Sequence, residues 1–328
     1  MSSSMHLADD LYKKDVSIEP IRKGFGRGLV EAGKQNSNVV ALCADLTEST
    51  QIHLFAKQFP ERYIEVGIAE QNLATVGAGL AAMGKVPFIS SYAAFSPGRN
   101  WEQIKTTACI NQRPVKVIGS HAGLYTGPDG ATHQMLEDIA LMRTLPNMVV
   151  IVPCDSVEAE KATLAMADHP QANYLRVARD GSPIVTTSHT PFEIGKAYVF
   201  AKGDDITLVS TGTMTYQALM AAEMLFKDGI DAEVVHVPTI KPLDGVTLLH
   251  SVRKTKHVIT IEEAQINGGL GSAVAELLGE HAPTPLLRMG IKDRFGESGQ
   301  PTELLEHFGL TSNNIRLAAV HMLETNHK

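Results

Sequence analysis

Short apolar runs alternate with helix-like segments through the first half of the chain. The runs are rich in β-branched residues and cover 38–43, 86–90, 115–119, 148–152 and 173–178. Between them lie segments of helical pattern, including one opened by Glu70 and one from Trp101 to Asn111. Such alternation is typical of a parallel sheet covered by helices.

The same alternation restarts after a stretch rich in proline and hydroxyl residues that begins at Asp180. Further strands are predicted over 205–212, 232–237, 257–263 and 285–291, with helices between and after them. Because Pro183 and Pro191 interrupt regular structure, we interpret 183–195 as a linker. The expected fold class is α/β, with two domains that each contain a mostly parallel sheet flanked by helices. We place them at 15–182 and 196–328, after a flexible tail over 1–14.

Composition narrows the class of protein. The 328 residues suffice for two domains, and 44% hydrophobic with 20% charged residues is ordinary for a soluble protein. A net charge of -7 argues against nucleic acid or an anionic membrane as partner. The three cysteines form no C-x-x-C pair, and the longest apolar run, Leu73 to Met83, is too short to span a bilayer. We therefore expect a cytoplasmic protein without disulfides.

Gly77, Gly79 and Ala82 match the G-x-G-x-x-A form of a dinucleotide-binding motif. That motif needs a strand directly before it, whereas Gln71 to Val76 has the pattern of a helix already begun at Glu70. We therefore interpret the glycines as packing residues within a helix.

Candidate chemistry gathers in the loops that follow the predicted strands, where open parallel sheets bind ligands. Asp45 follows the first strand, and "SSYAAFSPGRN" and "SHAGLYTGPDGATHQ" follow the next two. Taken singly, Tyr92 and Phe95 are ordinary core aromatics, His121 and His133 ordinary histidines, and the Gly-Pro-Asp-Gly run an ordinary turn. Their concentration at one edge favours a site.

Four stretches resemble the C-terminal part of transketolase, which contains the pyrimidine-binding and C-terminal domains of thiamine-diphosphate enzymes. They are "GIAEQN" at 67–72, "SYAAF" at 91–95, "DGATHQ" at 129–134 and "EEAQINGGLGSAVAE" at 262–276. They occur in the family's order, and the resemblance extends from about Asp15 to near the end.

The resemblance implies roles for the cofactor-binding residues. The carboxyl group of Glu70 would hydrogen-bond the far ring nitrogen of the aminopyrimidine and so favour the imino tautomer that deprotonates C2 of the thiazolium. Phe95 would stack on the pyrimidine and Tyr92 would help line its pocket. Asp45 and Leu46 complete the implied cofactor-binding set.

The resemblance also implies the groups that bind the sugar. His133 matches the catalytic histidine near the reacting carbonyl, and His121 and Asp129 match groups that contact sugar hydroxyls. Arg179 matches an arginine that binds the sugar phosphate, a task suited to its bidentate fork. The segment 96–101 is about one residue longer than usual, which leaves open whether Trp101 makes a further contact.

One expected motif is absent from the sequence. The family holds the cofactor diphosphate through a divalent metal with G-D-G and a later Asn, and no G-D-G occurs in the 328 residues. The resemblance therefore implies a split transketolase of the pentose phosphate pathway. An N-terminal partner subunit would carry the ligands for Mg²⁺ or Ca²⁺, and this chain would carry none. Self-association to a heterotetramer and sugar-phosphate substrates are also expected.

Three other enzyme classes and one non-enzyme class remain open. The beta subunit of a 2-oxo acid or acetoin dehydrogenase has the same two domains, although "GPDGATHQ" and "AEQN" favour sugar chemistry. A deoxyxylulose-phosphate synthase-like enzyme or a sulfosugar transketolase is also compatible. A non-catalytic scaffold subunit would not need Glu70, Phe95 and His133 together.

Overall fold

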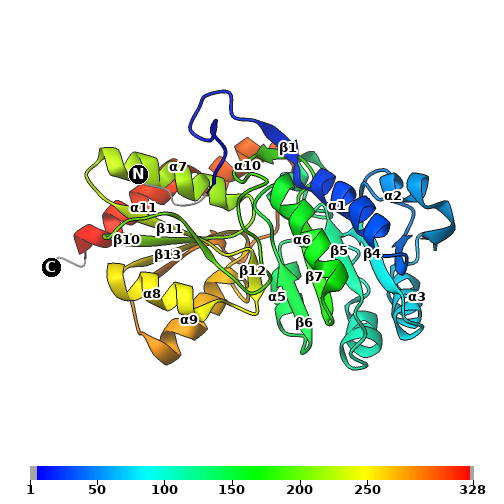
Figure 1. The fold of residues 1–328 in the computed structure, drawn as a ribbon. Coiled ribbons are helices and arrows are strands. Elements are labelled where there is room, and N and C mark those ends of the chain that lie inside the picture. Colours follow the sequence, from blue (N-terminus) through cyan, green and yellow to red (C-terminus); the bar gives the residue numbers. More distant parts are fainter. Residues whose placement is uncertain (1–5, 326–328) are drawn as a thin grey trace.

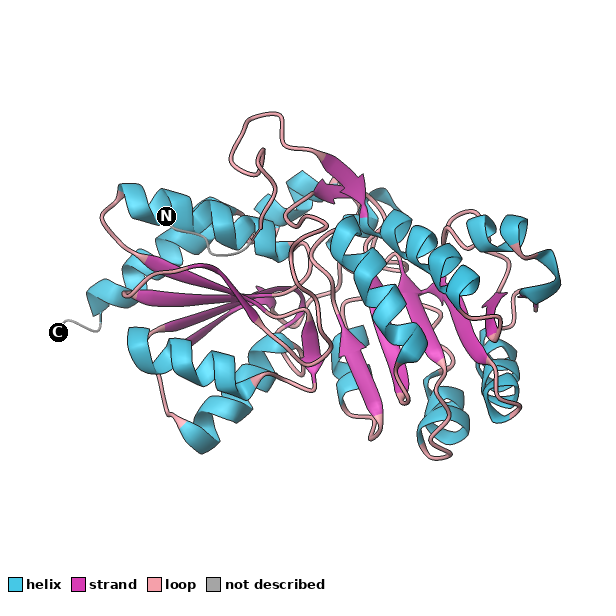
Figure 2. Ribbon diagram, in the orientation of Figure 1, coloured by secondary structure: helices cyan, strands magenta, loops and turns pink. Residues whose placement is uncertain are grey.

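The computed structural model describes residues 6–325 and contains two α/β domains that lie side by side (Figure 1). Each domain has a mostly parallel sheet with helices packed on its faces (Figure 2). The fold class predicted from the alternating pattern is thereby confirmed.

The first sheet has seven strands in the order β12-β6-β7-β5-β4-β2-β3, and all neighbours are parallel except β12 and β6. All residues of its central strands are buried or nearly so, as expected for a sheet covered on both faces. The strands are β2 (Val39–Cys43), β3 (Tyr63–Glu65), β4 (Val86–Tyr92), β5 (Lys116–Ser120), β6 (Met148–Ile151), β7 (Ala172–Val177) and β12 (Thr239–Lys241).

Two groups of helices cover this sheet, and each contributes to a separate apolar cluster. The first group is α1 (Ile21–Gln35), α2 (His53–Gln58) and α6 (Ser156–Asp168), with the 3₁₀ turn η1 (Pro60–Arg62) beside it. The second group is α3 (Glu70–Ala82), α4 (Trp101–Gln103), the π-helix η2 (Ile104–Cys109) and α5 (Asp138–Arg143). A further 3₁₀ segment, η3 (Leu124–Asp129), follows β5.

The helix expected from Trp101 to Asn111 is shorter and differently wound. It begins as α4, continues as the π-helix η2, and ends at Cys109. The hydroxyls of Thr106 and Thr107 donate to carbonyls one turn earlier, a bond that bends helices.

Gly77 lies within α3, as predicted when the dinucleotide interpretation was set aside. A Cβ there would come 2.7 Å from Cγ2 of Ile89 on β4. Glycine therefore permits the close approach of helix and sheet.

The second sheet has five strands in the order β14-β13-β10-β11-β9, with only β9 antiparallel. Its strands are β9 (Tyr198–Ala201), β10 (Ile206–Ser210), β11 (Ala232–His236), β13 (Val258–Gln265) and β14 (Leu286–Ile291). Five helices accompany it: α7 (Met214–Lys227), α8 (Gly245–Thr255), α9 (Leu270–His281), α10 (Pro301–His307) and α11 (Ser312–Thr325).

The segments expected to be tail and linker contact one another. Residues 1–5 of the expected tail lie outside the described residues, but Leu7 forms a β-bridge with Thr186, and Leu11 is buried. Farther along, β1 (Ile18–Pro20) pairs with β8 (Gly181–Pro183) in a two-stranded antiparallel sheet.

The two domains pack against each other through a common apolar core. Both large apolar clusters contain residues from the two sheets. A buried ion pair crosses between them, with Nε2 of His236 on β11 and Oε2 of Glu158 on α6 2.8 Å apart. Strand β12 follows β11 in the chain yet pairs with β6 of the first sheet.

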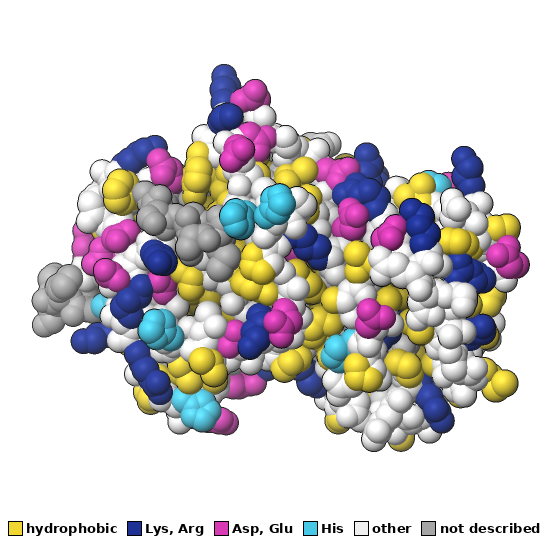
Figure 3. Space-filling view, in the orientation of Figure 1, with side chains coloured by type: hydrophobic (Ala, Val, Ile, Leu, Met, Phe, Trp, Pro, Cys, Tyr) yellow, Lys and Arg dark blue, Asp and Glu magenta, His cyan; other side chains and the backbone are white. Residues whose placement is uncertain are grey.

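On the face shown in Figure 3, acidic and basic side chains are interspersed over both domains. In residues 6–325, no helix is both long and apolar enough to cross a membrane.

Candidate active site

The candidate residues lie where parallel strands end at one edge of the first sheet. Strands β7, β5, β4 and β2 are consecutive neighbours. Tyr92 ends β4, while His121 directly follows β5. Asp45 and Arg179 lie two residues after β2 and β7, respectively. Because these strands are parallel, the loops that follow them lie at the same edge of the sheet.

Glu70 is the first residue of α3, and only 5% of its surface is exposed. A carboxylate is favoured there by the unpaired N–H groups at the start of the helix. The Asn100 side chain donates to the backbone carbonyl of Glu70 at 2.8 Å and so ties the start of α3 to the loop after β4. The carboxylate itself lies 3.7 Å from Nη1 of Arg99.

Four rings form a cluster at this edge. Tyr92 stacks on His121 with centroids 3.8 Å apart and on Phe95 at 5.8 Å. His133 meets Phe95 edge-on at 5.6 Å and Tyr92 edge-on at 6.1 Å. The structure therefore brings together rings from two separate sequence segments, those that follow β4 and β5.

Arg99 belongs to this site although the sequence did not single it out. Its guanidinium lies 4.1 Å from the centre of the Phe95 ring and also faces the carboxylate of Glu70. A planar cation on an aromatic face is a favourable arrangement. Arg99 thus contacts both the ring and the acid, and its side chain is 56% exposed.

His121 is buried and has a left-handed backbone conformation, with φ of 56°. Its Nδ1 lies 2.9 Å from the hydroxyl of Ser120. Burial, reinforced by the nearby Arg22 and Arg179, lowers the pKa of His121 to about 3. The ring is therefore neutral at neutral pH and can donate or accept a hydrogen bond.

Arg179 stands beside the loop that contains η3. Its Nη1 lies 3.6 Å from Oδ1 of Asp129 and donates to the carbonyl of Thr126 at 3.0 Å. Arg22, which the sequence did not indicate, donates from Nε to the carbonyl of Arg179 at 3.0 Å. Arg179 also lies 3.9 Å from Oδ1 of Asp180, so two arginines and two carboxylates lie on this side of the site. The Arg179 and Asp129 side chains are both 31% exposed.

Asp45 and Leu46 lie at the same sheet edge, on the side of β3. The N–H of Asp45 donates to Glu65 at 2.8 Å, and the carbonyl of Leu46 accepts from Thr50 at 3.0 Å. Among the described residues these contacts lead away from the ring cluster, so the two residues border the site.

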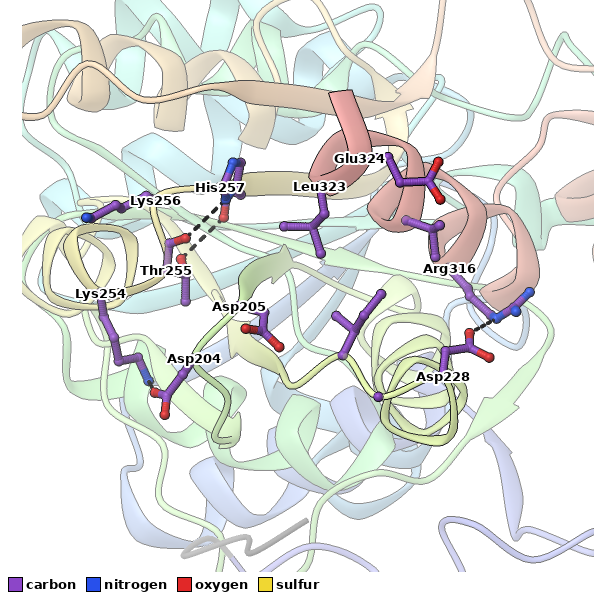
Figure 4. Close-up of a pocket in the computed structure, with 13 residues that line it drawn as sticks. Asp204, Asp205, Asp228, Lys254, Thr255, Lys256, His257, Arg316, Leu323 and Glu324 are labelled. Carbon is purple, nitrogen blue, oxygen red and sulfur yellow. Dashed lines mark hydrogen bonds and ion pairs between the residues drawn. The ribbon is translucent and has the colours of Figure 1, made fainter. Parts of the chain in front are cut away.

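A cavity of 790 Å³ lies elsewhere, in the second domain (Figure 4). Arg316 pairs with Asp228 on one wall, and Lys254 with Asp204 on another. None of its lining residues is a candidate site residue.

Two family models match consecutive parts of the chain. The model of the transketolase pyrimidine-binding domain matches residues 20–182, and that of the transketolase C-terminal domain matches residues 195–315. The chain belongs to the transketolase family. The resemblance inferred from four short motifs is thereby confirmed.

Several transketolase relatives match nearly the full length of this chain. A transketolase C-terminal section from Methanocaldococcus jannaschii is 44% identical over 299 residues, covering 90% of this chain and 93% of that protein. A 6-deoxy-6-sulfo-D-fructose transketolase subunit from Clostridium is 41% identical over 296 residues, covering 90% and 92%. A solved split-gene transketolase, described as an inactive β4 tetramer, is 44% identical with a TM-score of 0.87, covering 93% and 98%.

Transketolases use thiamine diphosphate, and the site of this family member suits the pyrimidine half of that cofactor. A buried carboxylate at Glu70 and an aromatic face at Phe95 converge on one place. The guanidinium of Arg99, a flat group of hydrogen-bond donors, contacts both of them.

The described residues do bring one set of metal-ligand side chains together, but not at this site. Cys154, Glu158 and His236 are fully buried between the transketolase domains, where Glu158 and His236 pair directly. This set is explained by that ion pair and is remote in sequence from the Glu70 and Phe95 elements.

Proposed function

We propose that this chain is the C-terminal subunit of a split transketolase. It transfers a two-carbon ketol unit from a ketose phosphate to an aldose phosphate, together with an N-terminal subunit. The observation that carries the proposal is that the buried Glu70 carboxylate and the Phe95 ring both contact the guanidinium of Arg99, in a chain without a G-D-G motif. We infer that this chain supplies the half of the site that binds the pyrimidine, and that the partner supplies the half that binds diphosphate and metal.

Each side chain has a role that follows from its position. Glu70 would hold a proton against the far ring nitrogen of the pyrimidine, and Phe95 and Tyr92 would pack against that ring. When bound, thiamine diphosphate supplies the carbon nucleophile. His133 and the neutral His121 hydrogen-bond the oxygens of the sugar, and Asp129 orients a hydroxyl. Arg179 binds the terminal phosphate of the sugar.

The relatives support a multi-subunit assembly. The solved relative forms a tetramer of β chains that its description calls inactive. We infer that this chain also associates with itself and that Mg²⁺ or Ca²⁺ enters the site on ligands of the N-terminal subunit.

The test is reconstitution with a partner that carries the G-D-G motif and the later Asn. We expect no transketolase activity from this chain alone and activity after mixing, rising until the two chains are equimolar. A coupled assay with ribose 5-phosphate as acceptor measures it, with and without cofactor and divalent metal. Activity of this chain alone, or none with any such partner, would contradict the proposal.

Arg179→Ala is expected to raise KM for phosphorylated sugars by about tenfold to a hundredfold, because a hydrogen bond to a charged group contributes about 1.5–3 kcal/mol. Unphosphorylated sugars should show little change in KM. Arg316→Ala is the matched control, since Arg316 pairs with Asp228 at the far cavity. An equal rise for both kinds of sugar would show that Arg179 has a structural role instead.

A second candidate substrate class is a sulfonated sugar. It is favoured by the 41% identity to the Clostridium subunit, whose name specifies 6-deoxy-6-sulfo-D-fructose. A sulfonate has one negative charge and three acceptor oxygens, so the same arginine could bind it. Comparing kcat/KM for the two donor sugars in the reconstituted enzyme separates the classes.

A further inference from the structure

The loop over 120–135 carries three of the candidate substrate groups, His121, Asp129 and His133. Within its own domain this loop is closed at its base, where the N–H of Gly123 donates to the carbonyl of Met135 at 2.9 Å. Between these points the chain runs through η3. From its own domain, Arg179 donates to the carbonyl of Thr126 and the N–H of Asp180 donates to the carbonyl of Tyr125, and the second domain adds further contacts.

The first of these contacts is made by Glu263, which lies near the end of β13 and is 2% exposed. Its Oε2 accepts a hydrogen bond from the N–H of Tyr125 within η3 at 3.3 Å. Its Oε1 accepts from the hydroxyl of Thr213 at 2.9 Å and lies 3.4 Å from Nη1 of Arg176. Arg176 in turn pairs with Asp138 at 2.9 Å.

Arg176 ties the same carboxylate to the base of the loop. Its Nη2 donates to the carbonyl of Met135 at 3.4 Å and to that of Glu263 at 3.1 Å. A Cβ at Gly123 would come within 2.7 Å of both Arg176 Nη2 and the Glu263 carboxyl carbon. Both ends of the loop are therefore packed against one buried ion pair that joins the two domains.

A second contact comes from the segment before α10. The side chain of Gln134 donates both to the carbonyl of Gly127 in the loop and to that of Glu297, each at 2.8 Å. A Cβ at Gly130 would lie 2.5 Å from the hydroxyl oxygen of Ser298. The second domain thus forms the surface on which the substrate loop rests.

We propose that Glu263 is a positioning residue for sugar binding, and that the second domain acts in the reaction by fixing the loop over 120–135. The carboxylate touches the loop backbone rather than substrate, so it acts through His121, Asp129 and His133. The expected change in KM rests on the proposed transketolase function, whereas the expected change in the mobility of the loop does not. Glu70 and Phe95 stand on other elements, so binding of the cofactor should be largely independent of Glu263.

The test uses Glu263→Gln, which keeps the shape of the side chain and removes its charge. In the reconstituted enzyme we expect KM for the sugar phosphate to rise about tenfold, while the Kd for thiamine diphosphate stays within about twofold. In this chain alone, hydrogen–deuterium exchange of 122–135 should become about tenfold faster, with the strands of both sheets unchanged.

Two further variants keep the test decisive. Thr213→Val removes one hydrogen bond from the carboxylate and leaves its charge, so it should give the same pattern to a smaller degree even where Glu263→Gln folds poorly. Glu276→Gln is the matched control, because Glu276 also pairs across the domains, with Arg143 at 2.6 Å, but on the exposed surface of α9.

Unchanged exchange at 122–135 in both Glu263→Gln and Thr213→Val would overturn the proposal. So would faster exchange throughout both domains, which would indicate a general loss of stability. If mixing with a partner gives no transketolase activity, the proposed function fails, yet the exchange measurement still decides whether Glu263 fixes the loop.

Discussion

Glu70→Ala is expected to lower the turnover of the reconstituted enzyme by roughly 10²-fold or more, the usual contribution of a positioned proton-transfer group. The methyl group left behind cannot share a proton with the pyrimidine nitrogen. Folding should survive, because the backbone carbonyl of residue 70 can still accept from Asn100. Steady-state kinetics at saturating cofactor, with circular dichroism of the free chain, measures both effects.

Glu233→Ala is the control for losing a buried carboxylate. Glu233 is 3% exposed and pairs with Lys254 in the second domain, away from the ring cluster. Its replacement should lower the free energy of unfolding and leave turnover of the folded enzyme unchanged. Near-normal turnover of Glu70→Ala at saturating cofactor would show that Glu70 does not take part in the reaction.

Binding of thiamine diphosphate should be at least about 10²-fold weaker to this chain alone than to the mixed subunits, a difference of about 2.8 kcal/mol. Glu70 and the rings can hold the pyrimidine, but the sequence contains no G-D-G motif with which to hold the diphosphate through a metal. Arg99 must also leave the face of Phe95 before the ring can stack there. Isothermal titration calorimetry with and without Mg²⁺ measures both affinities.

Removal of the divalent metal is the control for this prediction. Affinity for the mixed subunits should fall when the metal is chelated, whereas the weak affinity of this chain alone should not change. Thiamine without phosphates should bind both preparations similarly. Tight, metal-dependent binding by this chain alone would require a complete diphosphate site and would refute the divided arrangement.

The alternating apolar runs were enough to predict the long strands, because most of these are buried on both faces and each pairs with a parallel neighbour. Strands of only three residues are too short to produce a recognisable apolar run. β1 and β8 pair across more than 150 positions, and β12 pairs with a strand some 90 positions earlier. The pattern of apolar residues along the chain gives no information about pairing between strands so distant in sequence.

The site residues could be proposed from sequence because the resemblance to transketolase supplied them. Most lie in loops that follow parallel strands, which the topology places at one edge of the sheet. Arg99 and Arg22 were missed for a physical reason. Their positions have no periodicity, and only the folded geometry places one on Phe95 and the other against the backbone of Arg179. Glu263 lay within a quoted motif, yet its contact with Tyr125 joins two domains and has no local signature.

Strand β12 has a consequence for the modular history of such chains. In the chain it follows β9, β10 and β11 of the second sheet. In the structure it is the edge strand of the first sheet, beside β6. A gene cut at residue 195 would leave β6 with an open, wholly buried-type edge of Met, Val, Val and Ile, which is a template for aggregation. We therefore expect the two domains to be inherited together, because the first one needs β12 to cover the edge of its sheet.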